Sequence, residues 1–256
     1  MGLFGRLFEK KECSICGGEI GLLGNNKLAD GNMCDDCAGK LSPWFEDRRE
    51  STVEQIEEQL EYREENKKKV AAFNATRSFG DHKKVYLDED KMQFLVTDSR
   101  NYKTDNPDVL DFSQVTGVDL DTDQSRDEQK RRTPSGDYVS YNPPRYTYSY
   151  DFYVVIHVNH PYFQQMRIQL NNSSIEVEEV GRGGRVGGAT MNPEYREYQK
   201  MGQEIKRALT AARRTGRDAA AAAAAPKQAV TCPWCGATTM PTANGCCEYC
   251  GGSING

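Results

Sequence analysis

The residues with the most definite chemistry in this 256-residue chain are its nine cysteines. None lies between Cys37 and Cys232, so they form two groups, one toward each end. Eight of the nine belong to C-x-x-C pairs, a spacing that allows two thiolates to bind one metal ion. Without an export signal, such pairs favour metal binding in a reducing cytosol over a disulfide framework.

The first group has the pattern Cys13-x2-Cys16-x17-Cys34-x2-Cys37. Zinc prefers four soft ligands at tetrahedral corners, and a gap of about 15–20 residues between two pairs is usual for a structural site. Gly17 follows Cys16 and allows backbone amides to turn toward the sulfur atoms. The sequence predicts one Zn²⁺ here, and the alternatives are a redox dithiol or four unrelated thiols.

The second group has two halves that share C-x-aromatic-C-G, the paired knuckle of a zinc ribbon. The predicted zinc ligands are Cys232, Cys235, Cys247 and Cys250. Cys246 is the odd cysteine. We prefer Cys247 because two residues separate it from Cys250, the same spacing as in the first half. Cys246 would replace it after a register shift, or is a free thiol.

Both predicted sites are closed, because four thiolates leave no coordination position for water, so a hydrolytic role is not expected. Their expected role is to fold segments too small to bury a core, with about 10–16 kcal/mol of apparent metal-binding energy. Trp234 and Tyr249 either pack on the knuckles or form docking aromatics.

Elsewhere the chain shows no catalytic constellation: residues 181–185 lack the Lys-Ser/Thr of a P-loop, and His157 and His160 are expected on opposite faces of a strand. We predict that the protein is not an enzyme.

The formal net charge of -5 disfavours nonspecific nucleic-acid binding, which needs a basic surface. Four thiolates around Zn²⁺ carry a formal -2, so two sites would bring the total to about -9. No apolar run approaches the roughly 20 residues needed to cross a bilayer, and we expect a cytoplasmic location. Residues 1–8 are too short for a secretory signal; they are either a frayed or locally packed terminus or a short amphipathic membrane contact.

The chain is expected to have five segments. They are a zinc module (residues 1–45), a charged connecting helix (51–75), a β domain with a C-terminal helix (76–213), an Ala-rich linker (214–229) and a zinc ribbon (230–256). Ser51 and Glu54 match a capping box for the connecting helix. Arg63 and Lys67 interrupt its apolar stripe, so we expect an exposed arm docked at its ends, with a coiled-coil seam as the alternative.

From about residue 76 to residue 180 the apolar pattern alternates, as in strands. Residues 88–91 are expected to form a hairpin turn, and residues 146–158 one long strand with a bulge or bend. Residues 123–141 are polar and irregular, which predicts a mobile loop. The basic cluster in that loop is interpreted as solvated, with lipid-headgroup binding as the alternative. Its members are Arg126, Lys130, Arg131 and Arg132.

An amphipathic helix over residues 193–213 follows the strands. Antiparallel strands closed by one C-terminal helix are the outline of a pleckstrin-homology-like (PH-like) domain. The predicted fold class is therefore α+β: a PH-like antiparallel β-barrel or sandwich closed by a C-terminal helix and flanked by two small zinc-binding modules.

These features resemble a family of uncharacterised bacterial proteins with an N-terminal four-cysteine domain of unknown function, a PH-like middle domain and a C-terminal zinc ribbon. The most specific parts of the resemblance are residues 20–24 (IGLLG) and residues 41–43 (LSP), and it extends through residues 140–152 (SYNPPRYTYSYDF). It covers most of residues 10–212. The family implies zinc and the architecture but no activity.

The sequence thus predicts a non-enzymatic zinc-binding adaptor or scaffold for protein or membrane-associated assemblies. We expect a protein partner; a peripheral membrane contact is open, nucleic acid is disfavoured, and no small-molecule substrate is indicated. The alternative functions are a nucleic-acid-binding ribbon protein, based on the +2 charge of residues 213–256, and a thiol-redox or zinc-responsive switch, based on Cys246 and the dithiol pairs.

Overall fold

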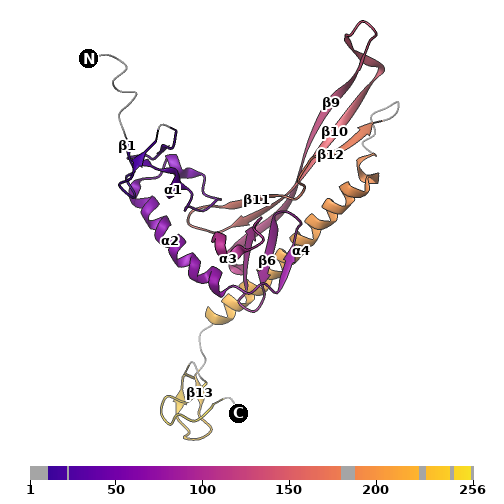
Figure 1. Cartoon of the computed structure of the whole chain (residues 1–256). Helices are drawn as coiled ribbons and strands as arrows, with labels where there is room; N and C mark the ends of the chain where they lie inside the picture. The colour runs from indigo at the N-terminus through magenta and orange to yellow at the C-terminus, as the bar shows by residue number, and fades with distance from the viewer. Residues whose placement is uncertain (1–10, 22, 180–187, 225–228, 243–244, 255–256) are drawn as a thin grey trace, which may run out of the picture. The chain divides into compact units, whose positions relative to one another are not determined.

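The computed structural model describes residues 11–21, 23–179, 188–224, 229–242 and 245–254 (Figure 1). The chain divides into two compact units, Met1–Gly216 and Arg217–Gly256. The predictions for residues 1–8 and for residues 181–185 lie outside the described residues. No described helix is both long enough and apolar enough to cross a membrane.

The first unit begins with a module of very short elements. Two antiparallel pairs of strands, β1 with β2 and β3 with β4, are followed by two short helices. The elements are β1 (Lys11–Glu12), β2 (Glu19–Ile20), β3 (Asn26–Lys27), β4 (Asn32–Met33), α1 (Asp35–Ala38) and η2 (Asp47–Arg49). Their buried apolar residues form a small cluster that also includes Ile56 of the next helix.

The N-cap of helix α2 (Val53–Ala72) lies one residue later than predicted. Thr52 is the N-cap, and its side chain accepts a hydrogen bond from the backbone N–H of Gln55 in a capping box. Ser51 instead donates its hydroxyl to the carbonyl of Asp47. The prediction of an arm that is exposed along its middle is wrong, because the middle of α2 is buried along one stripe. The stripe consists of Ile56, Gln59, Arg63, Asn66 and Val70.

The first sheet is an antiparallel meander in the order β5-β6-β7-β8. The predicted hairpin turn is confirmed, because Asp88 at the end of β6 pairs with Gln93 at the start of β7. The strands are β5 (Arg77–Phe79), β6 (Lys84–Asp88), β7 (Gln93–Thr97) and β8 (Leu110–Asp111). The short helices α3 (Tyr102–Asp105) and η3 (Phe112–Gln114) lie on either side of β8 in the sequence.

The second sheet is built around strand β10. This strand pairs with β9 along most of its length, with β11 through residues 153–157 and with β12 through residues 146–150. The strands are β9 (Val115–Arg132), β10 (Tyr138–Val158), β11 (Gln165–Gln169) and β12 (Ile175–Glu179). The predicted mobile loop at residues 123–141 is wrong: those residues form the outer part of a long β9–β10 hairpin, visible in Figure 1.

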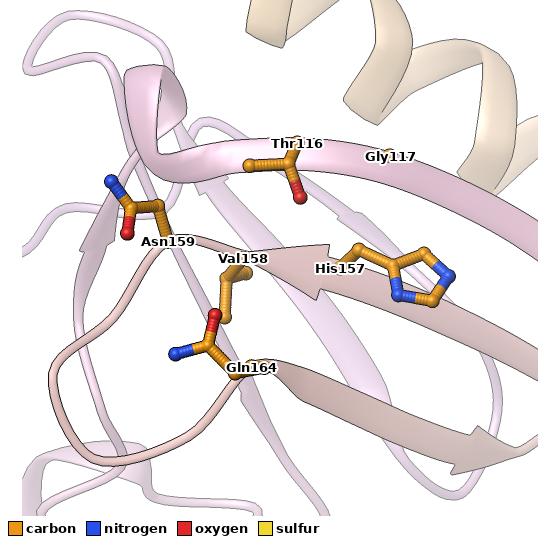
Figure 2. A pocket seen from close by; sticks show the side chains of 6 residues that line it. All are labelled: Thr116, Gly117, His157, Val158, Asn159 and Gln164. Atoms are coloured by element: carbon orange, nitrogen blue, oxygen red, sulfur yellow. The ribbon is translucent and has the colours of Figure 1, made fainter.

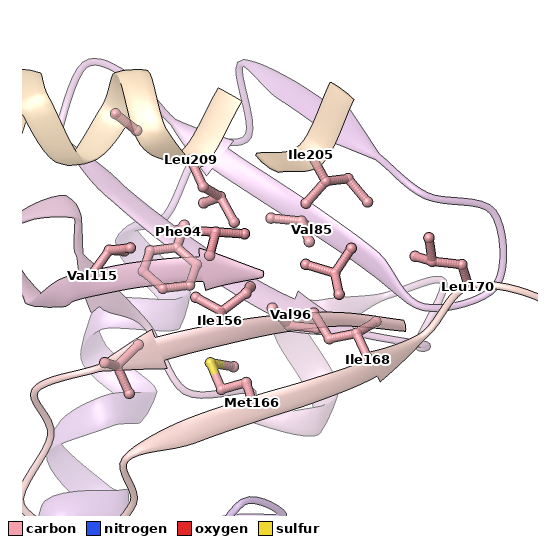
Figure 3. Close-up of a cluster of buried hydrophobic side chains, with 14 of the residues drawn as sticks. Val85, Phe94, Val96, Val115, Ile156, Met166, Ile168, Leu170, Ile205 and Leu209 are labelled. Carbon is pink, nitrogen blue, oxygen red and sulfur yellow. The ribbon is translucent and has the colours of Figure 1, made fainter. Parts of the chain in front are cut away.

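Helix α4 (Pro193–Ala224) follows the short helix η4 (Ala189–Met191) and contributes to one core shared by both sheets. Figure 3 shows Ile205 and Leu209 of α4 facing Phe94 of the first sheet and Ile156 of the second. No sheet among the described residues closes into a barrel, so the barrel prediction is not supported. The structure is a mixed α/β arrangement of several sheets, and both of its four-stranded sheets are open.

The second unit contains one further strand pair, β13 (Val230–Thr231) with β14 (Thr238–Thr239). Before it, α4 continues through the alanine run as far as Ala224. Alanine has the highest helix propensity of all residues, which accounts for a helix without a packed face here.

Candidate metal centres

The first four-cysteine cluster is assembled as the sequence predicts. The sulfur atoms of Cys13, Cys16, Cys34 and Cys37 all lie within 4.8 Å of one another. The Sγ atoms of Cys16 and Cys34 are 3.8 Å apart, and all four cysteines are free of disulfides. Two chain segments that are 17 residues apart therefore present four thiols to one point.

The first half of this cluster is a tight knuckle. The N–H of Gly17 donates to the carbonyl of Cys13 at 2.8 Å, and the N–H of Cys13 donates to the carbonyl of Gly18 at 2.8 Å. Gly17 has a φ of 70°, in the left-handed region that costs glycine nothing. The turn brings Cys13 and Cys16 to the same side of the backbone.

The second half is the start of a helix rather than a knuckle. Cys34 is the N-cap of α1, and Cys37 lies within the helix. The backbone N–H of Cys34 donates to Sγ of Cys13 at 3.3 Å, which connects the two halves. Amide donors aimed at sulfur favour the thiolate form.

The thiols of this cluster differ in the direction of their pKa shifts. Burial raises the pKa of Cys13, but hydrogen bonds from the backbone of Cys34, Cys16 and Ile15 outweigh it and lower the pKa to about 6. Burial and the neighbouring sulfur atoms raise the pKa of Cys37. Without a cation, closely spaced thiols cannot all ionise, because the thiolates repel one another. A bound divalent cation supplies the positive charge that allows all four to ionise.

The second cluster repeats this arrangement in the second unit. The sulfur atoms of Cys232, Cys235, Cys247 and Cys250 lie within 4.8 Å of one another. Sγ of Cys232 is 3.6 Å from that of Cys250, and Sγ of Cys235 is 3.7 Å from that of Cys247. Cys246 is outside the cluster and forms an isolated bridge with Ser253, so the geometry places Cys247 in the set.

Both halves of the second cluster are knuckles. The N–H of Gly236 donates to the carbonyl of Cys232, and the N–H of Gly251 donates to that of Cys247, each at 2.9 Å. Both glycines have φ near +70°, at 72° and 69°. Burial raises the pKa of Cys247, but backbone donors, including the N–H of Tyr249 at 3.4 Å from its sulfur, lower the pKa to about 7.

The aromatic residues of the second module are exposed. Trp234 is 75% exposed and Tyr249 is 74% exposed. The indole N–H of Trp234 donates to the carbonyl of Ser253 at 2.9 Å, and a Cβ on Gly252 would lie 2.8 Å from the ring. One edge of Trp234 therefore rests against the second knuckle, while most of its surface faces solvent.

A buried polar network that the sequence analysis missed connects the first module to the first sheet. Nη1 of Arg63 lies 2.7 Å from Oδ1 of Asp108, and both side chains are buried. The hydroxyl of Ser42 donates to Oδ2 of Asp108 at 2.8 Å, and Nε of Arg63 donates to the carbonyl of Lys40 at 3.1 Å. Burial raises the pKa of Asp108 and outweighs the opposite effects of Arg63 and Ser42.

Two amides of α2 extend this network. The side chain of Asn66 accepts from the N–H of Val109 at 3.0 Å and donates to the carbonyl of Pro107 at 2.8 Å. Oε1 of Gln59 accepts from the N–H of Ser42 at 3.3 Å. Gln59, Arg63 and Asn66 recur at helical spacing between Ile56 and Val70, and this is the signal by which the sequence could have shown them.

A shallow pocket of about 470 Å³ lies at the end of β10 in the first unit. Figure 2 shows its lining residues: Thr116, Gly117, His157, Val158, Asn159 and Gln164. Nε2 of His157 lies 3.1 Å from Oδ2 of Asp119, whereas His160 contacts the hydroxyl of Tyr62 at 2.9 Å. The two histidines thus have separate partners and share no site.

Residues 11–59 match a family described as Domain of unknown function (DUF4428). This stretch contains all four cysteines of the first cluster and the first turns of α2, so the predicted resemblance to a four-cysteine domain of unknown function is confirmed for the first module. The resemblance beyond residue 59 stays a prediction. No curated protein and no solved structure matches the chain.

Proposed function

We propose that the protein is a non-enzymatic zinc-binding scaffold in which each cysteine cluster holds one structural Zn²⁺. The observation that carries the proposal is the pair of four-sulfur clusters, each already gathered within 4.8 Å. Sulfur atoms about 2.3 Å from a tetrahedral zinc are about 3.8 Å from one another. The measured separations of 3.6, 3.7 and 3.8 Å fit that value.

The chemistry of the donor set supports zinc over harder cations. Thiolates are soft ligands that select zinc, whereas magnesium and calcium take oxygen. When bound, zinc supplies folding energy by closing a tetrahedral shell. The chain's own residues orient that shell: Gly17, Gly236 and Gly251 make the turns, and the N–H groups of Cys34 and Tyr249 donate to sulfur.

The scaffold role rests on the surfaces that these modules display. The first module is fixed to the sheets through Arg63 and Asp108. The second unit instead exposes Trp234 and Tyr249, residue types that are enriched in protein interfaces. We infer that this second unit is where a protein partner is recruited.

The experiment that tests the proposal is metal content per chain on full-length protein purified without added zinc. We expect two zinc ions per chain for the two clusters. Cys16→Ser and Cys235→Ser should each lose one, and Cys246→Ser is the matched control that should keep both. A wild-type ratio near one, a different metal, or loss of zinc in Cys246→Ser would contradict the proposed sites.

Nucleic-acid binding is the second candidate, favoured by the four basic and two acidic residues of residues 213–256. A salt-dependent mobility shift of labelled DNA or RNA that is lost in Trp234→Ala would support it, because exposed aromatics stack on bases. No shift at low salt would exclude it.

A further inference from the structure

The outer end of the β9–β10 hairpin, residues 129–145, is called the hairpin tip here. Its pairs include Arg132 with Tyr138, Lys130 with Ser140 and Gln129 with Arg145. The connecting turn is closed by the N–H of Thr133, which donates to the carbonyl of Asp137 at 2.8 Å. The tip is therefore a two-stranded ribbon with a register shift between Ser140 and Arg145, seen at the end of the β9–β10 arm in Figure 1.

The hairpin tip concentrates positive charge in a chain that is acidic as a whole. It carries four cations and one carboxylate, for a net charge of +3, against -5 for the chain. All four cations are exposed: Lys130, Arg131, Arg132 and Arg145. Within the part of the chain that the structure describes, none of the four forms an ion pair with a carboxylate. Their charge is available to an external anion.

The charge changes sign immediately behind the tip. Residues 119–128 of β9 carry five carboxylates and one cation, and β12 adds Glu176 and Glu178. At about 3.3 Å per residue, Glu128 lies about 7 Å and Asp123 about 23 Å further back than Lys130. Only the end of the arm is attractive to an anion, and an anionic molecule lying along the arm would meet carboxylates.

The cations project from both faces of the ribbon. Successive residues of a strand point to opposite faces, and paired residues share a face. Lys130 and Arg132 therefore lie on one face, and Arg131 lies on the other together with Arg145, the partner of Gln129. A ribbon lying in a nucleic-acid groove presents one face to the bases, whereas a ribbon that contacts a plane end-on uses cations on both faces.

Aromatic side chains accompany the cations. Tyr138 is 70% exposed next to the turn, and the guanidinium of Arg145 lies 4.5 Å from the ring centre of Tyr141. Tyrosine is enriched at the headgroup level of membranes because its ring is apolar and its hydroxyl is polar. The one carboxylate, Asp137, accepts a hydrogen bond from the hydroxyl of Ser135 at 2.8 Å.

We propose that the hairpin tip docks end-on against an anionic lipid surface. Charge complementarity and the two-faced distribution of cations favour a plane, which the tip meets first while Asp119, Asp121 and Asp123 of the stem stay beyond a Debye length of about 8–10 Å. This inference rests on the proposed scaffold function, and it names an anionic membrane as the surface that the scaffold binds. Metal content tests the zinc modules and vesicle binding tests the tip, so the two proposals fail separately.

The test is co-sedimentation of the full chain with phosphatidylcholine vesicles with and without about 30% phosphatidylserine. Binding should require phosphatidylserine and weaken when the salt rises from about 0.1 M to about 0.5 M. The variant Lys130→Gln/Arg131→Gln/Arg132→Gln should lower the partition coefficient about 100-fold, at about fivefold per cation. Tyr138→Ser should give a smaller loss that salt affects little.

The matched control is Lys67→Gln/Lys68→Gln/Lys200→Gln, which removes the same charge at exposed positions of α2 and α4. It should bind like the wild type apart from a small long-range effect. Equal loss in both triple variants, or binding that does not depend on phosphatidylserine, would overturn the proposal. The proposal would also be overturned if the tip variant bound vesicles as the wild type does but no longer bound a DNA or RNA duplex. That result would assign the tip to nucleic-acid binding.

Discussion

Each of the two cysteine modules brings four cysteine side chains together, but the residues that surround the four cysteines differ between the modules. The first combines a knuckle with a helix and rests on a buried apolar cluster. The members of that cluster are Cys13, Ile20, Leu28, Met33, Cys37, Leu41 and Ile56. The second has two knuckles, and among the described residues of its unit only Cys232, Thr239 and Cys247 are buried. The comparison shows how the contribution of a metal to folding depends on what else is buried around it.

The first module shares its stability with the rest of its unit. Ile56 belongs to α2, and the Arg63–Asp108 pair connects α2 and Ser42 to the loop before β8. A segment as short as the second module cannot bury enough apolar surface to offset its conformational entropy. We therefore expect the fold of the second module to depend on metal entirely, and that of the first only in part.

The largest effect should come from removal of metal from the full chain with a strong chelator. Apparent zinc-binding energies of about 10–16 kcal/mol exceed anything else that holds the second module together. Hydrogen exchange should show complete loss of protection at Gly236 and Gly251, whose N–H groups close the knuckles. The N–H of Leu28, which donates to the carbonyl of Gly31 beside the apolar cluster, should keep part of its protection.

Two results would contradict this difference between the modules. One is persistence of protection at Gly236 after metal is removed, and the other is equal loss at Leu28 and Gly236. Exchange at Phe94 in the core of the sheets is the internal control and should not change.

The next effect in size concerns the contact that fixes the first module in place. Arg63→Met leaves Asp108 buried without its partner, which should cost about 3–5 kcal/mol of unfolding free energy. The double variant Arg63→Met/Asp108→Leu should recover a large part of that loss, because no uncompensated charge remains buried. Urea unfolding of the full chain, monitored by circular dichroism, measures both.

The matched control for this pair is Arg77→Met, which removes the exposed partner of Glu89 at 3.0 Å. Exposed ion pairs contribute about 0–1 kcal/mol, so its unfolding curve should lie close to that of the wild type. A loss below about 1 kcal/mol in Arg63→Met would mean that the first module does not depend on this contact.

The cysteine clusters could be predicted because their ligands follow a local sequence pattern. Contacts between residues far apart in the sequence have no such local pattern. The C-x-x-C spacing is fixed by the metal, so Cys13 and Cys232 could be assigned from the sequence. The turn at Asp88 follows from the alternation on either side of it. Arg63, by contrast, pairs with Asp108, which lies 45 residues away. Helical spacing can indicate that Arg63 is on the buried face of α2, but it gives no sign of the partner.

The β9–β10 arm shows the second reason why prediction failed. A strand is recognised by an apolar face, and the outer part of this ribbon has solvent on both faces, so its alternation is absent. The backbone hydrogen bonds that define it are independent of side-chain type. Whether a sheet closes into a barrel likewise depends on which of its edge strands pair with each other. No local pattern in the chain specifies that pairing.

The smallest predicted effect is a pH dependence that arises from one histidine of the first unit. His160 contacts the hydroxyl of Tyr62 on α2 at 2.9 Å and stacks on Phe163 at 4.1 Å. Burial, and then the positive charges of Lys69 and Arg63, lower the pKa of His160 to about 4. The ordinary pKa of about 6.5 applies to the unfolded chain. Between these two values the unfolded state binds a proton that the folded state does not.

Stability should therefore be complete above about pH 6.5 and fall as the pH decreases toward 4, by about 1 kcal/mol at about pH 5 after allowance for screening by water. Thermal unfolding measured across this range should show the slope in the wild type and in His157→Gln, and a flatter profile in His160→Phe, which keeps the ring stack. Parallel profiles for the wild type and His160→Phe would rule out His160 as the source. Because His160 belongs to the first unit, His160→Phe should leave protection at Gly236 of the second module unchanged at every pH, and any loss of that protection at low pH reflects protonation of the cysteine ligands and release of metal.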